Sequence, residues 1–372
     1  MPPEEEIIMI LSRPLHTAAG QTRVRGLTAK GAVDYDRLLR LADDNGVSPF
    51  IFRNLTGDEG IPGPVVERIR TIYYRTLSRN LGHLKETLRL AGLLGAAGIE
   101  AVPLKGSLAS ELFFGDIGRY PTSDIDILVR PLDLGRARQV LEAAGYRNAE
   151  RIAWEDLKGS TYHAVMTNGS YHIELHWNLA MRYFSVAPEF WWQKTSRTVH
   201  EGREIIVLAP ERYLLYLIFR AFAKGFYPLK YLVLAAGLIS SSEKDFDWPA
   251  FSGLAGECGM GPLAAFTLSF LRNELGIDCP AKVIGSSAGY RLVGRIVLSG
   301  LFSPGRRVHV RMLLYALLLL SPKRSLPVLL RRIFPGSGEI RLRYGLPAKS
   351  KTLYLYYLLN PVFLITKRQG HR

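Results

Sequence analysis

The sequence is poor in cysteine and has no long apolar run. Its two cysteines, Cys258 and Cys279, have no neighbours at a metal-ligand spacing, which argues against a disulfide framework or a zinc site and favours a reducing cytosol. The longest apolar run, residues 312–320, is well short of the roughly 18 residues that cross a bilayer. We therefore expect no membrane-spanning helix.

The first residues do not follow the pattern of a secretory signal, so we expect no export. Residues 1–6 are acidic where such a signal is basic, and the apolar run at 7–11 is only about five residues long. These features predict a cytoplasmic protein.

Acidic residues are nearly absent from the last quarter of the chain. Residues 281–372 contain 17 Lys and Arg but one acid, Glu339, so the formal net charge of +15 belongs to this part and the rest is close to neutral. Leu-rich blocks alternate there with the basic doublets Arg306-Arg307, Lys323-Arg324, Arg331-Arg332 and Lys367-Arg368. For the basic amphipathic region 301–372 three interpretations stay open: solvated helix faces, a nucleic-acid patch, or a peripheral contact with the inner membrane surface, the functional interpretation that we favour.

What the sequence does contain is typical of a globular protein of two or three units: 372 residues, of which 48% are hydrophobic and 22% charged. Apolar periodicity predicts N-terminal helices over 33–55, 64–77 and 81–94, and later helices over 212–222, 229–239, 248–258 and 263–275. We divide the chain into an N-terminal helical segment (1–80), a core (81–208), a helical domain (209–300) and the basic region 301–372.

The chemistry-bearing pattern lies in the core. A short buried strand over 99–104 ends at the turn Lys105-Gly106-Ser107, a helix over 108–114 opens from this turn, and a second strand over 124–129 carries Asp124 and Asp126. Side chains alternate along a strand, so the two carboxylates point the same way and can hold hard cations. Helix-start N–H groups attract phosphate, and Gly106 lets that backbone approach closely. The pattern predicts metal-dependent chemistry on a nucleoside triphosphate, against the alternative of a solvated strand end.

A hairpin is predicted farther along the core. Alternating runs at 162–166 and 171–177 flank Asn168-Gly169, a strong hairpin signal. Glu174 shares one face of the second strand with His172 and His176, and it becomes a third carboxylate if this strand neighbours the Asp strand. The two histidines offer a competing interpretation, a site for zinc, manganese or iron. The aromatic cluster that follows could stack on a base, but core packing is favoured; it comprises Trp177, Tyr183, Phe184, Phe190, Trp191 and Trp192.

With these residues in place, the sequence resembles the bacterial uncharacterised nucleotidyltransferase family of the DNA polymerase β-like superfold. The resemblance is densest at 104–145 and 173–177, and it implies an α+β fold: a small mixed sheet with flanking helices, plus N-terminal and C-terminal helical parts. It also implies that Asp124, Asp126 and Glu174 are catalytic and bind magnesium, with manganese as an alternative. Lys105, Gly106 and Ser107 would bind the nucleotide, as would Arg119 and Ser123 beside them. One departure is the 16 residues between Ser107 and Asp124, more than compact members have.

The reaction expected from the resemblance is transfer of a nucleoside monophosphate from a nucleoside triphosphate, such as ATP, to an acceptor hydroxyl. The acceptor could be a sugar, another small molecule, a protein or an RNA end. The competing hypothesis is a catalytically degenerate nucleotide-binding or scaffold protein that docks on a membrane surface or nucleic acid through its basic C-terminal region.

Overall fold

The computed structural model of the chain describes residues 1–149, 154, 161–180, 184, 186–284, 288–303, 308–320, 322–346 and 350–366. A five-stranded sheet positions the site, with strands in the order β1-β2-β5-β4-β3. The strands are β1 (Ala101–Pro103), β2 (Ile125–Val129), β3 (Arg147–Asn148), β4 (His163–Thr167) and β5 (His172–His176). The β2–β5 pair is parallel and the other pairs are antiparallel, which confirms the predicted small mixed sheet.

The strand β2 lies between β1 and β5 and is buried along its whole length. Its aliphatic and β-branched residues suit a strand that is covered on both faces. In the register with β5, Asp126 lies opposite Glu174, which confirms that the two acidic strands are neighbours. Asp126 and Glu174 are therefore direct neighbours on adjacent strands.

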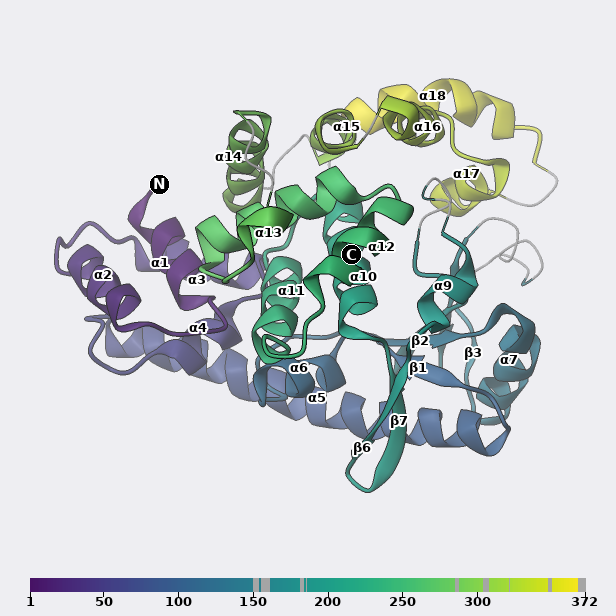
Figure 1. Ribbon diagram of the computed structural model, residues 1–372, viewed down its shortest axis with the longest axis horizontal. Helices are drawn as coiled ribbons and strands as arrows, with labels where there is room; N and C mark the ends of the chain where they lie inside the picture. Colours follow the sequence, from purple (N-terminus) through teal and green to yellow (C-terminus); the bar gives the residue numbers. More distant parts are fainter. Residues whose placement is uncertain are drawn as a thin grey trace.

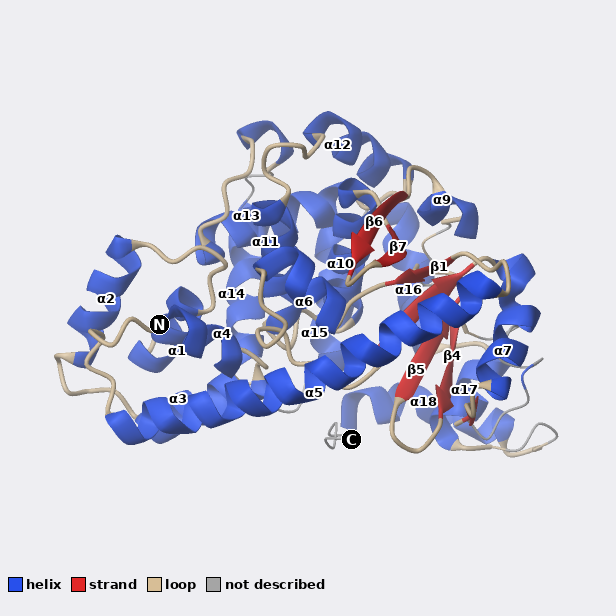
Figure 2. Cartoon of the chain, turned by 90° about the horizontal axis from the view of Figure 1, so that it is seen from below, coloured by secondary structure: helices blue, strands red, loops and turns tan. Residues whose placement is uncertain are grey.

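A single long helix, α5 (Gly63–Ala96), runs beside the sheet (Figures 1 and 2). The expectation of two helices, one ending near residue 77 and one beginning at 81, is wrong because no proline or glycine lies between 78 and 81 to end the first. Asn80, fully buried in the middle of α5, donates its amide to the carbonyls of Ile117 and Tyr120 at 2.6 and 2.7 Å. The predicted boundary at residue 80 therefore falls inside this helix.

Two shorter helices complete the core around the sheet. α6 (Ser107–Phe114) begins at the Gly106 turn, and α7 (Leu134–Ala143) follows a single 3₁₀ turn at Pro131–Asp133. The buried residues of α7 are Leu134, Ala137 and Leu141, as its periodicity predicts.

A two-stranded hairpin, β6 (Ser196–His200) and β7 (Arg203–Val207), is an element that the sequence reading did not predict. Its turn residues Glu201 and Gly202 both have positive φ, 48° and 73°, the geometry of a tight hairpin turn. Glu-Gly is a weak turn signal compared with Asn-Gly, and most of the β6 side chains are exposed, so neither the turn nor an apolar alternation marks this hairpin in the sequence.

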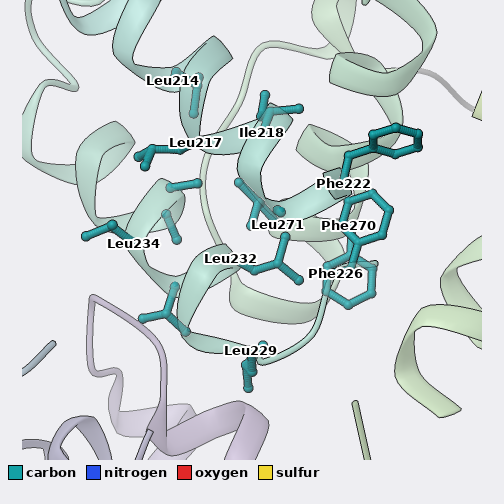
Figure 3. Close-up of a cluster of buried hydrophobic side chains, with 14 of the residues drawn as sticks. Leu214, Leu217, Ile218, Phe222, Phe226, Leu229, Leu232, Leu234, Phe270 and Leu271 are labelled. Carbon is teal, nitrogen blue, oxygen red and sulfur yellow. The ribbon is translucent and has the colours of Figure 1, made fainter. Parts of the chain in front are cut away.

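Most of the remaining helices contribute side chains to a common apolar core. They are α1 (Pro3–Leu11), α2 (Ala18–Thr28), α3 (Tyr35–Asp44), α4 (Ser48–Asn54), α9 (Pro188–Trp192), α10 (Pro210–Ala223), α11 (Lys230–Ser241), α12 (Trp248–Glu257), α13 (Gly261–Leu275), α14 (Ala288–Phe302), α15 (Val308–Leu319), α16 (Pro322–Ile333), α17 (Ser337–Tyr344) and α18 (Leu353–Thr366). Helices α10 to α13 lie where the sequence predicts them. Figure 3 shows Leu214, Ile218 and Phe222 of α10 packed among side chains of the neighbouring helices.

This core extends well beyond one segment of the chain. A single hydrophobic cluster contains Ile8 from α1, Leu217 from α10 and Tyr315 from α15. Buried Asn45 strengthens the connection, since its side-chain amide donates to Leu301 and its side-chain oxygen accepts from the N–H of Leu229. The four-part domain division stays a prediction, and the packing joins its three helical parts.

The aromatic cluster behaves as core where the structure describes it: Trp177, Phe184, Trp191 and Trp192 are buried and Phe190 is partly buried, whereas Tyr183 lies outside the described residues. Among the described residues, no helix combines the length and the apolar character that a membrane crossing requires.

Candidate active site

The turn after β1 is held from both sides. The N–H of Leu104 donates to the carbonyl of Asp126 at 3.0 Å, and the carbonyl of Leu104 accepts a hydrogen bond from the Tyr213 hydroxyl of α10. The next residues are Lys105 and Gly106, and Gly106 has φ 98° and ψ −146°, a region that only glycine adopts readily. A Cβ at Gly106 would lie 3.2 Å from Thr122 Oγ1. The glycine is therefore required both by its backbone angles and by the close approach of Thr122.

Lys105 connects the two aspartates. Its Nζ lies 2.6 Å from Asp126 Oδ2 and 3.2 Å from Asp124 Oδ2. Asp126 is fully buried, whereas the Asp124 side chain, one residue before β2 begins, is 25% exposed. The pair therefore forms one wall of the site, with Asp124 at its open side and Lys105 between the two carboxylates.

Glu174 and His176 complete this wall from β5. His176 Nε2 lies 3.0 Å from Asp126 Oδ1 and 3.3 Å from Glu174 Oε2. Ligand atoms of Asp126, Glu174 and His176 lie within 4.8 Å of one another and could hold a metal ion. Asp124 is not part of that cluster and is linked to it through Lys105. His172, at the other end of β5, is exposed, so the structure does not bring the two predicted histidines together.

The electrostatics follow from burial and from this crowding. Burial raises the pKa of Asp126, against the opposing charge of Lys105. Burial would lower the pKa of Lys105, but the Asp126 and Asp124 carboxylates raise it well above its usual range. Burial would also raise the pKa of Glu174, yet the hydrogen bond from His176 and the Lys105 charge hold it far below its usual value. Glu174 is therefore ionised at every working pH and is a poor proton acceptor.

The imidazoles of His176 and His163 have pKa values shifted in opposite directions. Burial would lower the pKa of His176, but its contacts to Asp126 and Glu174 raise it. On the neighbouring strand, burial and the adjacent His176 lower the pKa of His163 to about 3. His163 is thus neutral near pH 7, whereas the two acids favour the protonated form of His176, and a metal ion bound through its Nε2 would displace that proton.

The remaining predicted nucleotide-binding residues lie in different places. Ser107 is buried at the first position of α6, and Ser123 is exposed next to Asp124. The Arg119 guanidinium faces Asp116, with its Nε 3.8 Å from the carboxylate, and Asp116 in turn pairs with Arg53 of α4 at 2.7 Å. Arg119 is therefore held toward the N-terminal helices, and its contact with the nucleotide stays a prediction.

Sequence reasoning missed the residues that α10 and α11 bring to the site. Tyr213, Tyr216 and Arg220 come from α10, more than 80 residues after Asp126 in the sequence. The available signal was Arg220 within the apolar run that follows Arg212, but helical spacing alone does not show which neighbour a polar residue faces.

The donor atoms fit a divalent cation. Asp126 Oδ2 and Glu174 Oε2 are buried beside cationic groups, with Lys105 Nζ at 2.6 Å from the first and His176 Nε2 at 3.3 Å from the second, so this position already favours a positive charge such as that of a metal ion. Two carboxylates suit magnesium, and the third donor, an imidazole nitrogen, suits manganese better. Asp126, Glu174 and His176 would hold such an ion, with Asp124 beside them.

Comparison with known proteins identifies the family of the chain. None of the curated proteins compared matches the sequence significantly. Among solved structures, the antibiotic-resistance factor ANT(2'')-Ia matches at 14% identity with a TM-score of 0.33, over 48% of this chain and 91% of that chain, and a likeness this weak supports no argument about fold or substrate. The family model described as "Uncharacterised nucleotidyltransferase" matches residues 31–276, which include the whole sheet and helices α10 to α13. The chain therefore belongs to this uncharacterised nucleotidyltransferase family.

Proposed function

We propose that the protein transfers a nucleoside monophosphate from a nucleoside triphosphate to an acceptor hydroxyl, with magnesium or manganese as cofactor. The observation that carries this proposal is the register of β2 and β5, which puts Asp126 opposite Glu174 beside the Gly106 turn. The acceptor oxygen would form a bond to the α-phosphorus, the bond from that phosphorus to the β-phosphate oxygen would break, and pyrophosphate would leave.

Each residue has a part that its surroundings support. Asp126, Glu174 and His176, with Asp124 beside them, would hold the cation, which when bound neutralises phosphate charge and acidifies the acceptor hydroxyl. We assign Glu174 to orientation, because its lowered pKa makes it a weak base. The acceptor proton would leave at the open side of the site, where the side chain of Asp124 is 25% exposed. Lys105, Gly106 and Ser107 would contact the phosphates.

The test is metal-dependent nucleotide binding by thermal shift with each of the four ribonucleoside triphosphates, followed by pyrophosphate release and transfer of an α-phosphate label. We expect magnesium to be required, and Asp126→Asn to lose turnover while far-UV circular dichroism stays unchanged. Asp58→Asn is the matched control, because Asp58 is exposed in a loop and has no side-chain contact among the described residues. Full turnover by Asp126→Asn, or binding that needs no metal, would reject the proposal in favour of the degenerate, scaffold-like alternative.

A second proposal concerns peripheral membrane contact through residues 301–372. Leu317 on α15, Leu326 on α16 and Leu358 on α18 are 54%, 58% and 76% exposed, on three helices that pack together. Leucines exposed this far, within a strongly basic region, suit insertion beside anionic headgroups. The doublets Arg306-Arg307 and Lys367-Arg368 lie outside the described residues, and the side chains of the other two doublets are not described either.

A further inference from the structure

One face of α10 points at the candidate active site. Tyr213, Tyr216, Arg220 and Lys224 follow one another at spacings of three and four residues, so they form one stripe along the helix. The opposite side of the helix is occupied by Leu214, Ile218 and Phe222, which Figure 3 shows inside the apolar core. The hydrogen bond from Tyr213 to Leu104 fixes the stripe against the residue before Lys105. About two turns farther along the same stripe comes Arg220.

Arg220 is buried and only partly hydrogen-bonded. It is 7% exposed and shares a side-chain hydrogen bond with Tyr162, but its Nε has no partner among the described residues. Burial opposes its charge, but Tyr216, Asp126 and Glu174 raise the pKa of the guanidinium well above its usual value. The carboxylates of Asp126 and Glu174 therefore stabilise the charge of Arg220. Among the described residues, the guanidinium forms no ion pair with either carboxylate.

Two lysines add positive charge to the side of the site where Arg220 lies. Lys224, which follows α10, is exposed. Lys230, the first residue of α11, donates from its Nζ to the carbonyl of Pro121 at 2.9 Å, and its Nζ lies 5.2 Å from the centre of the Tyr120 ring. Pro121 begins the segment that leads into Asp124. The start of α11 thus holds a cation beside the open end of the aspartate pair.

The charges near the site do not balance without an anion. Among the described residues, three carboxylates (Asp124, Asp126 and Glu174) are near four cationic side chains, namely Lys105, Arg220, Lys224 and Lys230. A divalent metal ion at the carboxylates would increase the positive excess. Like charges this close repel each other strongly when partly desolvated, so the arrangement favours a ligand with several negative charges.

We propose that Arg220, Lys224 and Lys230 form the binding site for the β- and γ-phosphates of the nucleoside triphosphate, opposite the carboxylate wall. This inference rests on the proposed nucleotidyl transfer and names the part of the substrate that α10 and α11 recognise. The planar guanidinium of Arg220 can donate two hydrogen bonds to one phosphate, and the lysines supply point charges at the rim. Selectivity for triphosphates over monophosphates then resides in the helical unit and not in the sheet.

The experiment measures the dissociation constants of inorganic tripolyphosphate, a nucleoside triphosphate and the matching nucleoside monophosphate on the full chain, by calorimetry with and without magnesium. We expect Lys224→Gln, Lys230→Gln and Arg220→Gln each to weaken binding of both triphosphate ligands about tenfold, roughly one charge-assisted contact, with little change for the monophosphate. Arg220→Lys should restore part of the affinity. The matched controls are Lys244→Gln and Arg25→Gln, since both side chains are exposed and neither contacts the site.

Equal losses for triphosphate and monophosphate, or no loss in any of the three variants, would overturn the inference. If Arg220→Gln does not fold, Lys224→Gln and Lys230→Gln still decide, because the side chain of Lys224 is exposed and that of Lys230 is only partly buried. The proposed function fails differently. The three variants could lose tripolyphosphate binding selectively although the unaltered chain never releases pyrophosphate. That result would support the phosphate-binding site and reject the transfer reaction.

Discussion

At the scale of single residues, Gly106 is the position where a one-carbon change has the clearest expected effect. We expect Gly106→Ala to lower the free energy of unfolding by about 1 to 3 kcal/mol, the usual cost of a strained backbone region, and to weaken nucleotide binding because the turn shifts. Gly135→Ala in α7 is the matched control, since nothing lies within 4 Å of its Cβ and its φ is ordinary. It should be neutral or stabilising by up to about 1 kcal/mol. Urea titration of both variants checks this, and equal effects would contradict it.

Lys230 gives the proposed phosphate site a pH dependence. Burial and the nearby Lys105 and Lys224 ammonium groups lower the pKa of Lys230 to about 8, against the opposing pull of Asp124 and Asp126. Below that pH the side chain is charged and attracts phosphate, and above it this attraction is lost. We therefore expect the dissociation constant of a nucleoside triphosphate to rise between pH 7.5 and 9.5.

The control for this prediction is Lys230→Arg, whose guanidinium stays charged over the whole range. Ionisation of the ligand affects both proteins alike, so the difference between the two profiles belongs to residue 230. If the dissociation constants of both proteins changed with pH in the same way, Lys230 would not contact the phosphates. This conclusion would hold independently of Arg220 and Lys224.

The site residues that the sequence predicts are those fixed by local periodicity. Asp124 and Asp126 share a face because strands alternate, and Glu174 follows from the alternation within β5. Arg220 and Lys230 reach the site through the packing of helices far away in the sequence, and no local pattern contains that information. The nucleotide-binding role of Arg119 was implied by the resemblance and stays a prediction, and in the structure Arg119 and Arg53 both contact Asp116.

At the scale of elements, helices α6 and α11 pack closely against each other at Gly237 of α11. A Cβ at Gly237 of α11 would lie 2.3 Å from two ring carbons of Phe114, the last residue of α6. We expect Gly237→Ala to destabilise the protein by about 1 to 3 kcal/mol, the cost of overpacking, although alanine favours helix. Gly253→Ala in α12, where nothing lies within 4 Å, should be neutral or stabilising.

A double-mutant cycle isolates this contact. Phe114→Leu should lose packing alone but should remove much of the penalty of Gly237→Ala in the double variant, because the ring that clashes is gone. Strict additivity of the two changes in chemical denaturation would show that α6 and α11 are not in contact at these residues.

Elements with a strong local signal were predictable, and those set by tertiary contacts were not. Helices α10 to α13 follow from their apolar periodicity and their proline starts. The expectation of two helices in place of α5 failed because buried Asn80 interrupts the apolar pattern without interrupting the helix. The side chains of β6 are mostly exposed, and the turn between β6 and β7 is Glu-Gly. The sequence therefore shows neither an apolar alternation nor a strong turn signal for this hairpin.

At the scale of the whole molecule, the question is what the exposed leucines of α15, α16 and α18 contact. If they enter a membrane surface, the full chain should co-sediment with anionic phospholipid vesicles at low salt and much less at 1 M salt, where charges are screened beyond about 3 Å. Leu317→Glu combined with Leu358→Glu should weaken sedimentation at every salt concentration, because it removes apolar contact and adds repulsion. Leu81→Glu on α5, with a side chain of similar exposure, is the matched control.

The membrane and the active site are separable in this test. Asp126→Asn should sediment like the unaltered chain, since its carboxylate is buried in the sheet. Equal binding to neutral and anionic vesicles, or unchanged binding of the double leucine variant, would contradict a membrane contact made through this region. Binding that disappears with the leucines and with salt, while pyrophosphate release continues, would place the transfer reaction at a membrane surface and narrow the acceptor to molecules that reach it there.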